Sequence, residues 1–129
     1  MQKQKIAQLI FNFKIVYMNI LKKIYDEKLS SDEAIDLIDE ARVLYYKDKD
    51  FDGNFRDYLE MDNFEYTAYA WGCTLNTIAK WRYEGWPTHD CKTGKKINYK
   101  EYGWFPICID EESETYGLTI KCQKKDYEL

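Results

Sequence analysis

The sequence predicts an α+β fold that is mainly α, with an N-terminal helical hairpin, two short central helices and a small C-terminal antiparallel sheet or wing. Three observations support this prediction. Apolar residues recur at three- and four-residue steps through residues 1–47, Gly72 marks a corner between two short helical stretches, and apolar and polar residues alternate after Pro87. Since 129 residues can bury a sizeable core, we expect one compact domain.

Residues 1–47 are expected to form two antiparallel helices joined by a short turn. Apolar side chains recur at helical spacing between Ile6 and Ile24, and Ser30 with Glu33 then makes a capping box that begins the second helix. The second helix continues to about Tyr45. Such a hairpin could cover the helices that follow, or pair with a second copy to give a homodimer through the N-terminal helices.

Residues 48–62 read as an acidic connecting loop that reproduces the first half of an EF-hand calcium loop, including Gly53 at its bend. The second half fails, because Leu59 stands where the bidentate Glu is needed. Asp57 could close a shorter loop, but Asp and Gly are also ordinary turn formers between helices, and the missing ligand favours the plain turn. The candidate calcium ligands are Asp48, Asp50, Asp52 and Asp57.

Residues 63–87 are predicted to form two short helices across a tight corner. Asp62 and Glu65 match a capping box for the first helix, and Gly72 can adopt the left-handed backbone that ends it. Thr74 can cap a second helix over residues 75–84, which Gly85 and Pro87 stop. The expected apolar core of the corner is Ala68, Trp71, Cys73, Ile78 and Trp81.

This segment resembles the helix-turn-helix of bacterial and phage DNA-binding proteins, with Gly72 four residues after Ala68, Ile78 six later and Trp81 three later. The run GCTLNTIAKWRYEGWP looks most like the MerR and excisionase-type branch, where G-V-S-x-x-T-I-x-x-W is common. Cys73 and Thr74 depart from that pattern, since the branch often has Val and Ser there. The resemblance covers residues 64–87 and implies that helix 75–84 enters the DNA major groove.

Residues 88–129 alternate apolar and polar side chains over 96–99, 104–109 and 116–120, as half-buried strands do. Loops are expected at Thr93-Gly94 and over 111–115. A zinc site is conceivable, but no C-x-x-C pair is present, and the histidine is more simply a surface residue after a proline turn. The four residues of that conceivable site are His89, Cys91, Cys108 and Cys122.

Composition and motifs narrow the function classes. The chain has one histidine and lacks hydrolase, phosphate-loop, zinc-protease and dinucleotide-binding motifs, so we expect no enzyme and no cofactor. Polar residues interrupt the N-terminal apolar run and no cleavage site follows, so we expect a cytoplasmic protein whose four cysteines are reduced thiols.

The net charge of −4 argues against a protein coated in nucleic acid, yet residues 71–100 carry six basic and two acidic side chains. The first functional prediction is therefore a sequence-reading DNA-binding regulator of phage or mobile-element type. With Ile78 and Trp81 facing inward, helix 75–84 would turn polar side chains outward, Asn76 toward adenine and the lysines toward phosphates. The expected DNA-binding residues are Thr74, Asn76, Thr77, Lys80, Arg82, Tyr83, Lys95 and Lys96.

The alternative is an acidic inhibitor that grips a single partner protein, such as a phage anti-defence, antitoxin or immunity protein. Net acidity and 12 tyrosines support it, because tyrosine is enriched at protein interfaces. Retention on heparin or DNA at low salt would discriminate between the two classes.

Overall fold

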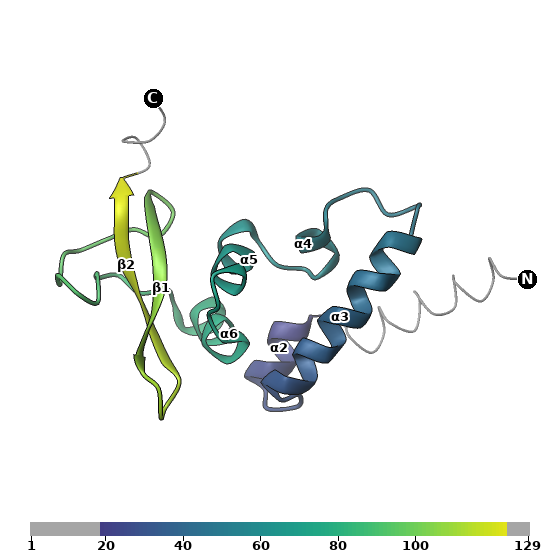
Figure 1. Ribbon diagram of the computed structural model, residues 1–129, viewed down its shortest axis with the longest axis horizontal. Coiled ribbons are helices and arrows are strands. Elements are labelled where there is room, and N and C mark those ends of the chain that lie inside the picture. Colours follow the sequence, from purple (N-terminus) through teal and green to yellow (C-terminus); the bar gives the residue numbers. More distant parts are fainter. Residues whose placement is uncertain (1–18, 124–129) are drawn as a thin grey trace, which may run out of the picture. The chain divides into compact units, whose positions relative to one another are not determined.

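The computed structural model describes residues 19–123 (Figure 1). Over these residues the fold is α+β and mainly α, with five helices and one two-stranded antiparallel sheet, so the predicted fold class is confirmed. The chain divides into two compact units, one up to Asn63 and one from Phe64 onward, where the sequence led us to expect a single compact domain. None of the helices within residues 19–123 combines the length and the apolar character needed to span a membrane.

The first unit contains α2 (Ile20–Tyr25) and α3 (Ser31–Lys47). The predicted capping box is confirmed, since the amide of Glu33 donates to Ser30 Oγ and the amide of Ser30 donates to Glu33 Oε1. The earlier part of the predicted first helix, before Asn19, lies outside the described residues. The buried side chains of the two helices are Ile20, Leu21, Ile24, Ala34, Ile38 and Ala41.

Part of the segment predicted as a connecting loop is helical. Asn54 caps the short helix α4 (Phe55–Tyr58) in a second capping box, with the Asp57 amide donating to Asn54 Oδ1 at 3.1 Å. The rings of Phe51 and Tyr58 meet edge-on at 4.9 Å, and both contact the ring of Tyr45 on α3. This aromatic cluster orders a segment whose acidic composition had suggested a solvated loop.

The second unit begins with α5 (Asn63–Ala70) and α6 (Leu75–Glu84), and the predicted bounds of α6 are confirmed. Gly72 has φ 97° at the corner, a conformation that glycine adopts without steric cost. Trp71 was expected in the core, and that prediction is wrong. Because α5 ends one residue earlier, Trp71 lies in the turn, 58% exposed, with its ring edge-on to Phe105 at 4.9 Å.

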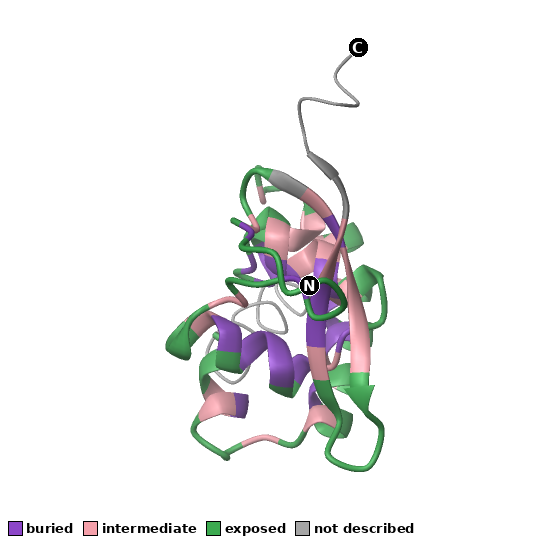
Figure 2. Cartoon of the chain, turned by 90° about the vertical axis from the view of Figure 1, so that its left-hand side faces the viewer, coloured by how far each residue is buried: buried purple, intermediate pink, exposed green. Residues whose placement is uncertain are grey.

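The sheet pairs β1 (Tyr102–Asp110) with β2 (Thr115–Gln123), so two of the three predicted strands are confirmed. Lys96, in the third predicted strand, makes only an isolated bridge with His89. Trp104 and Leu118 are buried, whereas the β1–β2 turn over 111–114 is exposed (Figure 2). The hairpin therefore packs through its strands and leaves its turn in solvent.

Candidate nucleic-acid interface

Helix α6 presents a narrow polar stripe to solvent. Leu75, Ile78 and Trp81 are between 0% and 7% exposed, so they form the inner face. Asn76 and Lys80 are exposed, one turn apart, on the outer face. Tyr83, 38% exposed, continues the same line at the next turn. We call Asn76, Lys80 and Tyr83 the α6 stripe.

The inner face of α6 is held by a stack of aromatic rings. The ring of Trp81 lies 4.9 Å from that of Trp86, which stacks on Tyr99 at 4.2 Å with an interplanar angle of 8°. Trp86 also contacts Trp104 on β1 at 5.6 Å. Large rings of this kind bury much apolar area and fix the helix orientation, so the stripe sits on a rigid support.

Thr77 does not face outward, which corrects the sequence prediction. It is 8% exposed, and its hydroxyl lies 2.8 Å from Thr74 Oγ1 and donates to the backbone carbonyl of Glu114 at 3.4 Å. Thr74 itself caps α6, since its Oγ1 accepts from the Thr77 amide at 3.3 Å. Thr77 therefore joins the first turn of α6 to the β1–β2 turn and cannot reach a base, whereas the half-buried Thr74 caps the helix.

The side chain of Arg82 forms an ion pair within the second unit. Its Nε donates to Glu65 Oε2 at 2.5 Å and its Nη2 donates to Glu65 Oε1 at 2.6 Å. Glu65 on α5 is only 2% exposed. The hydrogen bond with Glu65 is the main cause that raises the pKa of Arg82 above its ordinary value, so the cation is permanent. This ion pair ties α5 to α6 and leaves the Arg82 side chain 23% exposed.

Lys95 and Lys96 lie on a separate element, a tight turn over residues 90–97 that we call the lysine turn. Lys92, which the sequence prediction did not include, belongs to it as well, and all three lysines are exposed. The turn is closed by backbone hydrogen bonds from the Asp90 amide to the Lys95 carbonyl and from the Gly94 amide to the Asp90 carbonyl, both 2.8 Å long.

Asp90 is the residue that anchors the lysine turn. It is 3% exposed, and its carboxylate accepts hydrogen bonds from the amides of Lys92, Thr93 and Ile120 at 2.7, 3.1 and 2.8 Å. The hydroxyl of Thr119 donates to the same group at 3.1 Å. These donors, the Ile120 amide first, lower the pKa of Asp90 to about 2.

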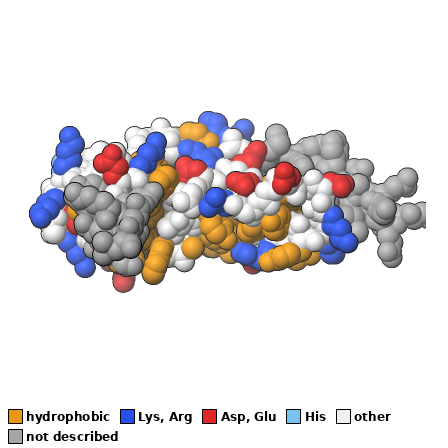
Figure 3. All heavy atoms as spheres, turned by 90° about the horizontal axis from the view of Figure 1, so that it is seen from above, with side chains coloured by type: hydrophobic (Ala, Val, Ile, Leu, Met, Phe, Trp, Pro, Cys, Tyr) orange, Lys and Arg blue, Asp and Glu red, His pale blue; other side chains and the backbone are white. Residues whose placement is uncertain are grey.

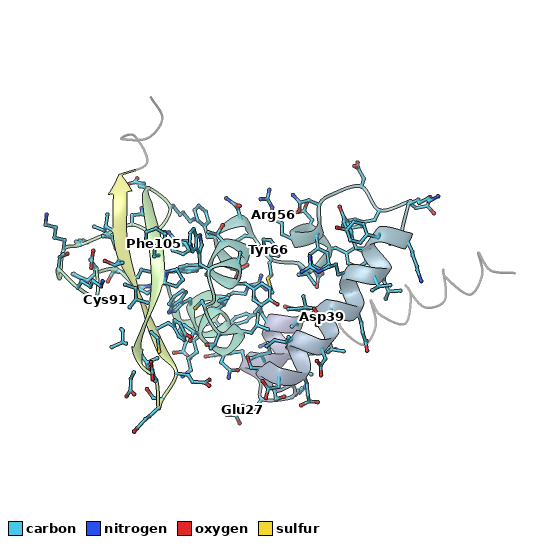
Figure 4. All side chains as sticks on the ribbon, in the orientation of Figure 1. Glu27, Asp39, Arg56, Tyr66, Cys91 and Phe105 are labelled. Carbon is cyan, nitrogen blue, oxygen red and sulfur yellow. The ribbon has the colours of Figure 1, made fainter. Side chains whose placement is uncertain are left out.

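Sequence reasoning missed Asp90, although one local signal was available. An Asp placed two and three residues before amides in a turn is typical of an Asx turn, and Thr93-Gly94 had already been identified as a loop. The contacts with Thr119 and Ile120 on β2 join distant parts of the chain, and no local pattern predicts them. Cys91 lies beside β2 in this region (Figure 4), with its amide donating to the Leu118 carbonyl at 2.9 Å.

The candidate metal ligands are not brought together. Within residues 19–123, no cluster of three or more His, Cys, Asp or Glu side chains has the arrangement to hold a metal ion. In the acidic segment, Asp57 is engaged in capping α4, and Asp48 is the C-terminal cap of α3. The conceivable zinc ligands His89, Cys91 and Cys108 do not gather either, and the side chain of Cys122 lies outside the described residues.

The described cysteines Cys73, Cys91 and Cys108 are free thiols. Burial raises the pKa of Cys73 at the corner to about 12, so that thiol remains neutral and packs as a small apolar side chain.

The charges around these elements are mixed. On the face drawn in Figure 3, Lys and Arg side chains are interspersed with Asp and Glu. The exposed lysines of the second unit within the described residues are Lys80, the three on the lysine turn and Lys100. Comparison of the chain with protein-family models, with curated proteins and with solved structures finds no match.

Proposed function

We propose that this protein is a small DNA-binding regulator, of phage or mobile-element type and acting in the cytoplasm, whose second unit reads the major groove with α6. The observation that carries the proposal is the division of α6 into two faces. Leu75, Ile78 and Trp81 are buried, while Asn76 and Lys80 are exposed one turn apart beyond a capped, glycine-containing corner. A helix supported in this way can enter a groove without disturbing its own packing.

Each member of the α6 stripe suits a different contact. Asn76 can donate to and accept from the N7 and N6 edge of adenine, which distinguishes that base from the other three. Lys80, one turn later, suits a phosphate. Tyr83 can lay its ring against the sugar–phosphate backbone and hydrogen-bond through its hydroxyl. Base reading is thereby concentrated on Asn76 and positioning on the other two.

The lysine turn supplies a second group of phosphate contacts. Lys92, Lys95 and Lys96 are exposed on a turn that Asp90 holds in one conformation. Cations fixed on a rigid support lose less conformational entropy when they meet a phosphate than cations on a mobile loop. Each such contact releases counterions from DNA and makes binding weaker as salt rises.

The test is selection of bound sequences from a random duplex DNA pool, followed by titrations of variants at two salt concentrations. Asn76→Ala should cost about 1–3 kcal/mol at the selected site and little on other sequences. Lys80→Ala should weaken binding to every sequence about equally and reduce the log–log salt slope by roughly one unit. Lys49→Ala removes an exposed lysine from the first unit and should leave both quantities unchanged.

Two outcomes would refute the proposal. One is a parent protein that enriches no sequence and binds DNA no better than an acidic control protein. The other is a loss of affinity in Lys49→Ala equal to that in Lys80→Ala, which would indicate contact by general charge. The protein-binding alternative would then become the better account of the chain.

A further inference from the structure

Helix α3 in the first unit carries a line of exposed apolar side chains. Ile35, Val43 and Tyr46 are 41%, 54% and 75% exposed. With Asp39 they follow one another at helical spacing along one exposed side of α3, and the line is about 17 Å long at 1.5 Å per residue. Side chains of this size and exposure on one helix face mark an interaction surface more often than chance scatter.

Carboxylates surround this line. Asp32, Asp36 and Asp39 are exposed and lie along the same face as the apolar side chains. We call the set of Asp32, Ile35, Asp36, Asp39, Val43 and Tyr46 the α3 stripe. Among the described residues, none of its three carboxylates has a salt bridge, whereas Lys22–Asp26 and Arg82–Glu65 are ion pairs. Within residues 19–123 their negative charge is therefore not compensated by an ion pair.

The cation on α3 that is nearest to Asp39 in the sequence is Arg42. Arg42 places its guanidinium over the ring of Phe55, 4.5 Å from the centroid. The ring face holds the guanidinium there with its charge intact, so Arg42 offsets one of the three aspartates and the N-terminal part of the stripe stays acidic. The opposite side of α3 is fully anchored, because Ala34, Ile38 and Ala41 are each 0% exposed. The stripe is therefore a preorganised helical face with acidic and apolar character together.

We propose that the α3 stripe docks a basic amphipathic helix of a partner protein. A straight helical face with apolar anchors at regular spacing is matched by another helix, whose own apolar line packs against Ile35, Val43 and Tyr46. The three aspartates select Lys and Arg on the flanks of that helix and disfavour acidic ones. Tyr46, the most exposed of the apolar group, is of the residue type that most often dominates binding energy.

The surface belongs to the first unit, so the inference does not depend on DNA binding by α6. Asp39→Lys should leave the DNA titrations described above unchanged, and Lys80→Ala should leave helix docking unchanged.

The experiment uses a fluorescently labelled amphipathic helical peptide of Leu and Lys as the probe, titrated with the full chain. Saturable binding is expected, and a Leu and Glu peptide with the same pattern should not bind. Asp39→Lys and Tyr46→Ala should each raise Kd by about tenfold or more. Glu112→Lys makes the same change of charge on an exposed residue of the second unit, outside α3, and should leave Kd within about twofold.

Three results would overturn the proposal. The first is equal weakening of binding by Glu112→Lys and Asp39→Lys. The second is equal binding of the acidic and basic peptides. The third is no saturable binding of the basic peptide while the parent chain melts cooperatively. Analytical ultracentrifugation of the chain alone measures its oligomeric state and tests whether a second copy of this chain occupies the stripe. A parent dimer that Asp39→Lys converts to a monomer would assign the stripe to a second copy of this chain instead of a partner protein.

Discussion

Arg82 on α6 and Glu65 on α5 form a bidentate ion pair between positions that are 17 residues apart. The Nε–Oε2 distance is 2.5 Å and the Nη2–Oε1 distance is 2.6 Å. The carboxylate is almost completely buried, and the guanidinium side chain is 23% exposed. Removing one partner from such a pair leaves an uncompensated charge inside the protein, which costs more than the pair itself contributes.

Glu65→Ala should therefore lower the free energy of unfolding by about 3 kcal/mol, measured by urea denaturation. The double variant Glu65→Ala/Arg82→Ala should lose less than the sum of the two single variants, because neither charge is then left alone. Glu84→Ala, an exposed acid on the same helix, should change stability by less than about 0.5 kcal/mol. Additive single and double variants would contradict this account of the pair.

The two tryptophans at either end of the corner should behave differently. Trp81 is 7% exposed and Trp71 is 58% exposed. Trp81→Ala should cost about 3–5 kcal/mol and lower the melting temperature markedly, because it leaves a cavity beside Trp86. Trp71→Ala should cost less than about 1 kcal/mol, since most of its ring already contacts water. Thermal melts followed by circular dichroism measure both, and equal losses would show that the corner packs differently.

Asp90 predicts how stability depends on acid. Its folded-state pKa is about 2, below the ordinary value of 3.8, so the unfolded chain binds its proton more readily than the folded unit does. The stabilisation is therefore complete above about pH 4 and is lost as the pH falls from about 4 to 2. Asp90→Asn should lower the melting temperature at pH 7 and flatten its fall across that acidic window. Parallel curves for parent and variant would rule out this role.

Calcium is expected to leave the melting temperature of the protein unchanged. An ion bound only by the folded state must raise the melting temperature. The carboxylate of Asp57 already accepts the Asn54 amide at the start of α4, and no cluster of metal-binding side chains is found within residues 19–123. Adding millimolar calcium should give the same melting temperature as adding magnesium or a chelator. An upward shift in the parent that disappears in Asp48→Ala would instead establish the acidic segment as a calcium site.

Local signals were sufficient for much of the fold. The capping box at Ser30, the cap at Thr74 and the glycine at position 72 each act within a few residues, and the helix boundaries that they predict are found in the structure. Helix α4 was missed, because its order comes from aromatic rings contributed by α3 and by Phe51.

The residues of the candidate site were harder to predict from the sequence, because contacts between distant positions again decide which side chains are buried. Helical periodicity indicated that Ile78 and Trp81 face inward, but the burial of Thr77 depends on the Glu114 carbonyl, 37 positions away. The sequence also does not indicate which basic side chains form ion pairs inside the protein. Arg82 and Lys80 look alike in the sequence, yet Arg82 meets a buried carboxylate and Lys80 lies exposed. Long-range contacts decide which polar residues are left for function.

The bond from the Ile120 amide to Asp90 links positions 30 residues apart, and this separation has a kinetic consequence. The lysine turn acquires its anchor only when β2 has reached its place, because closing so long a segment precedes any gain from the contact. During refolding we expect the amide of Ile120 to become protected from hydrogen exchange after those of α6, whose cap is local. Complete order in this turn therefore depends on the docking of β2, which makes it a late event in folding.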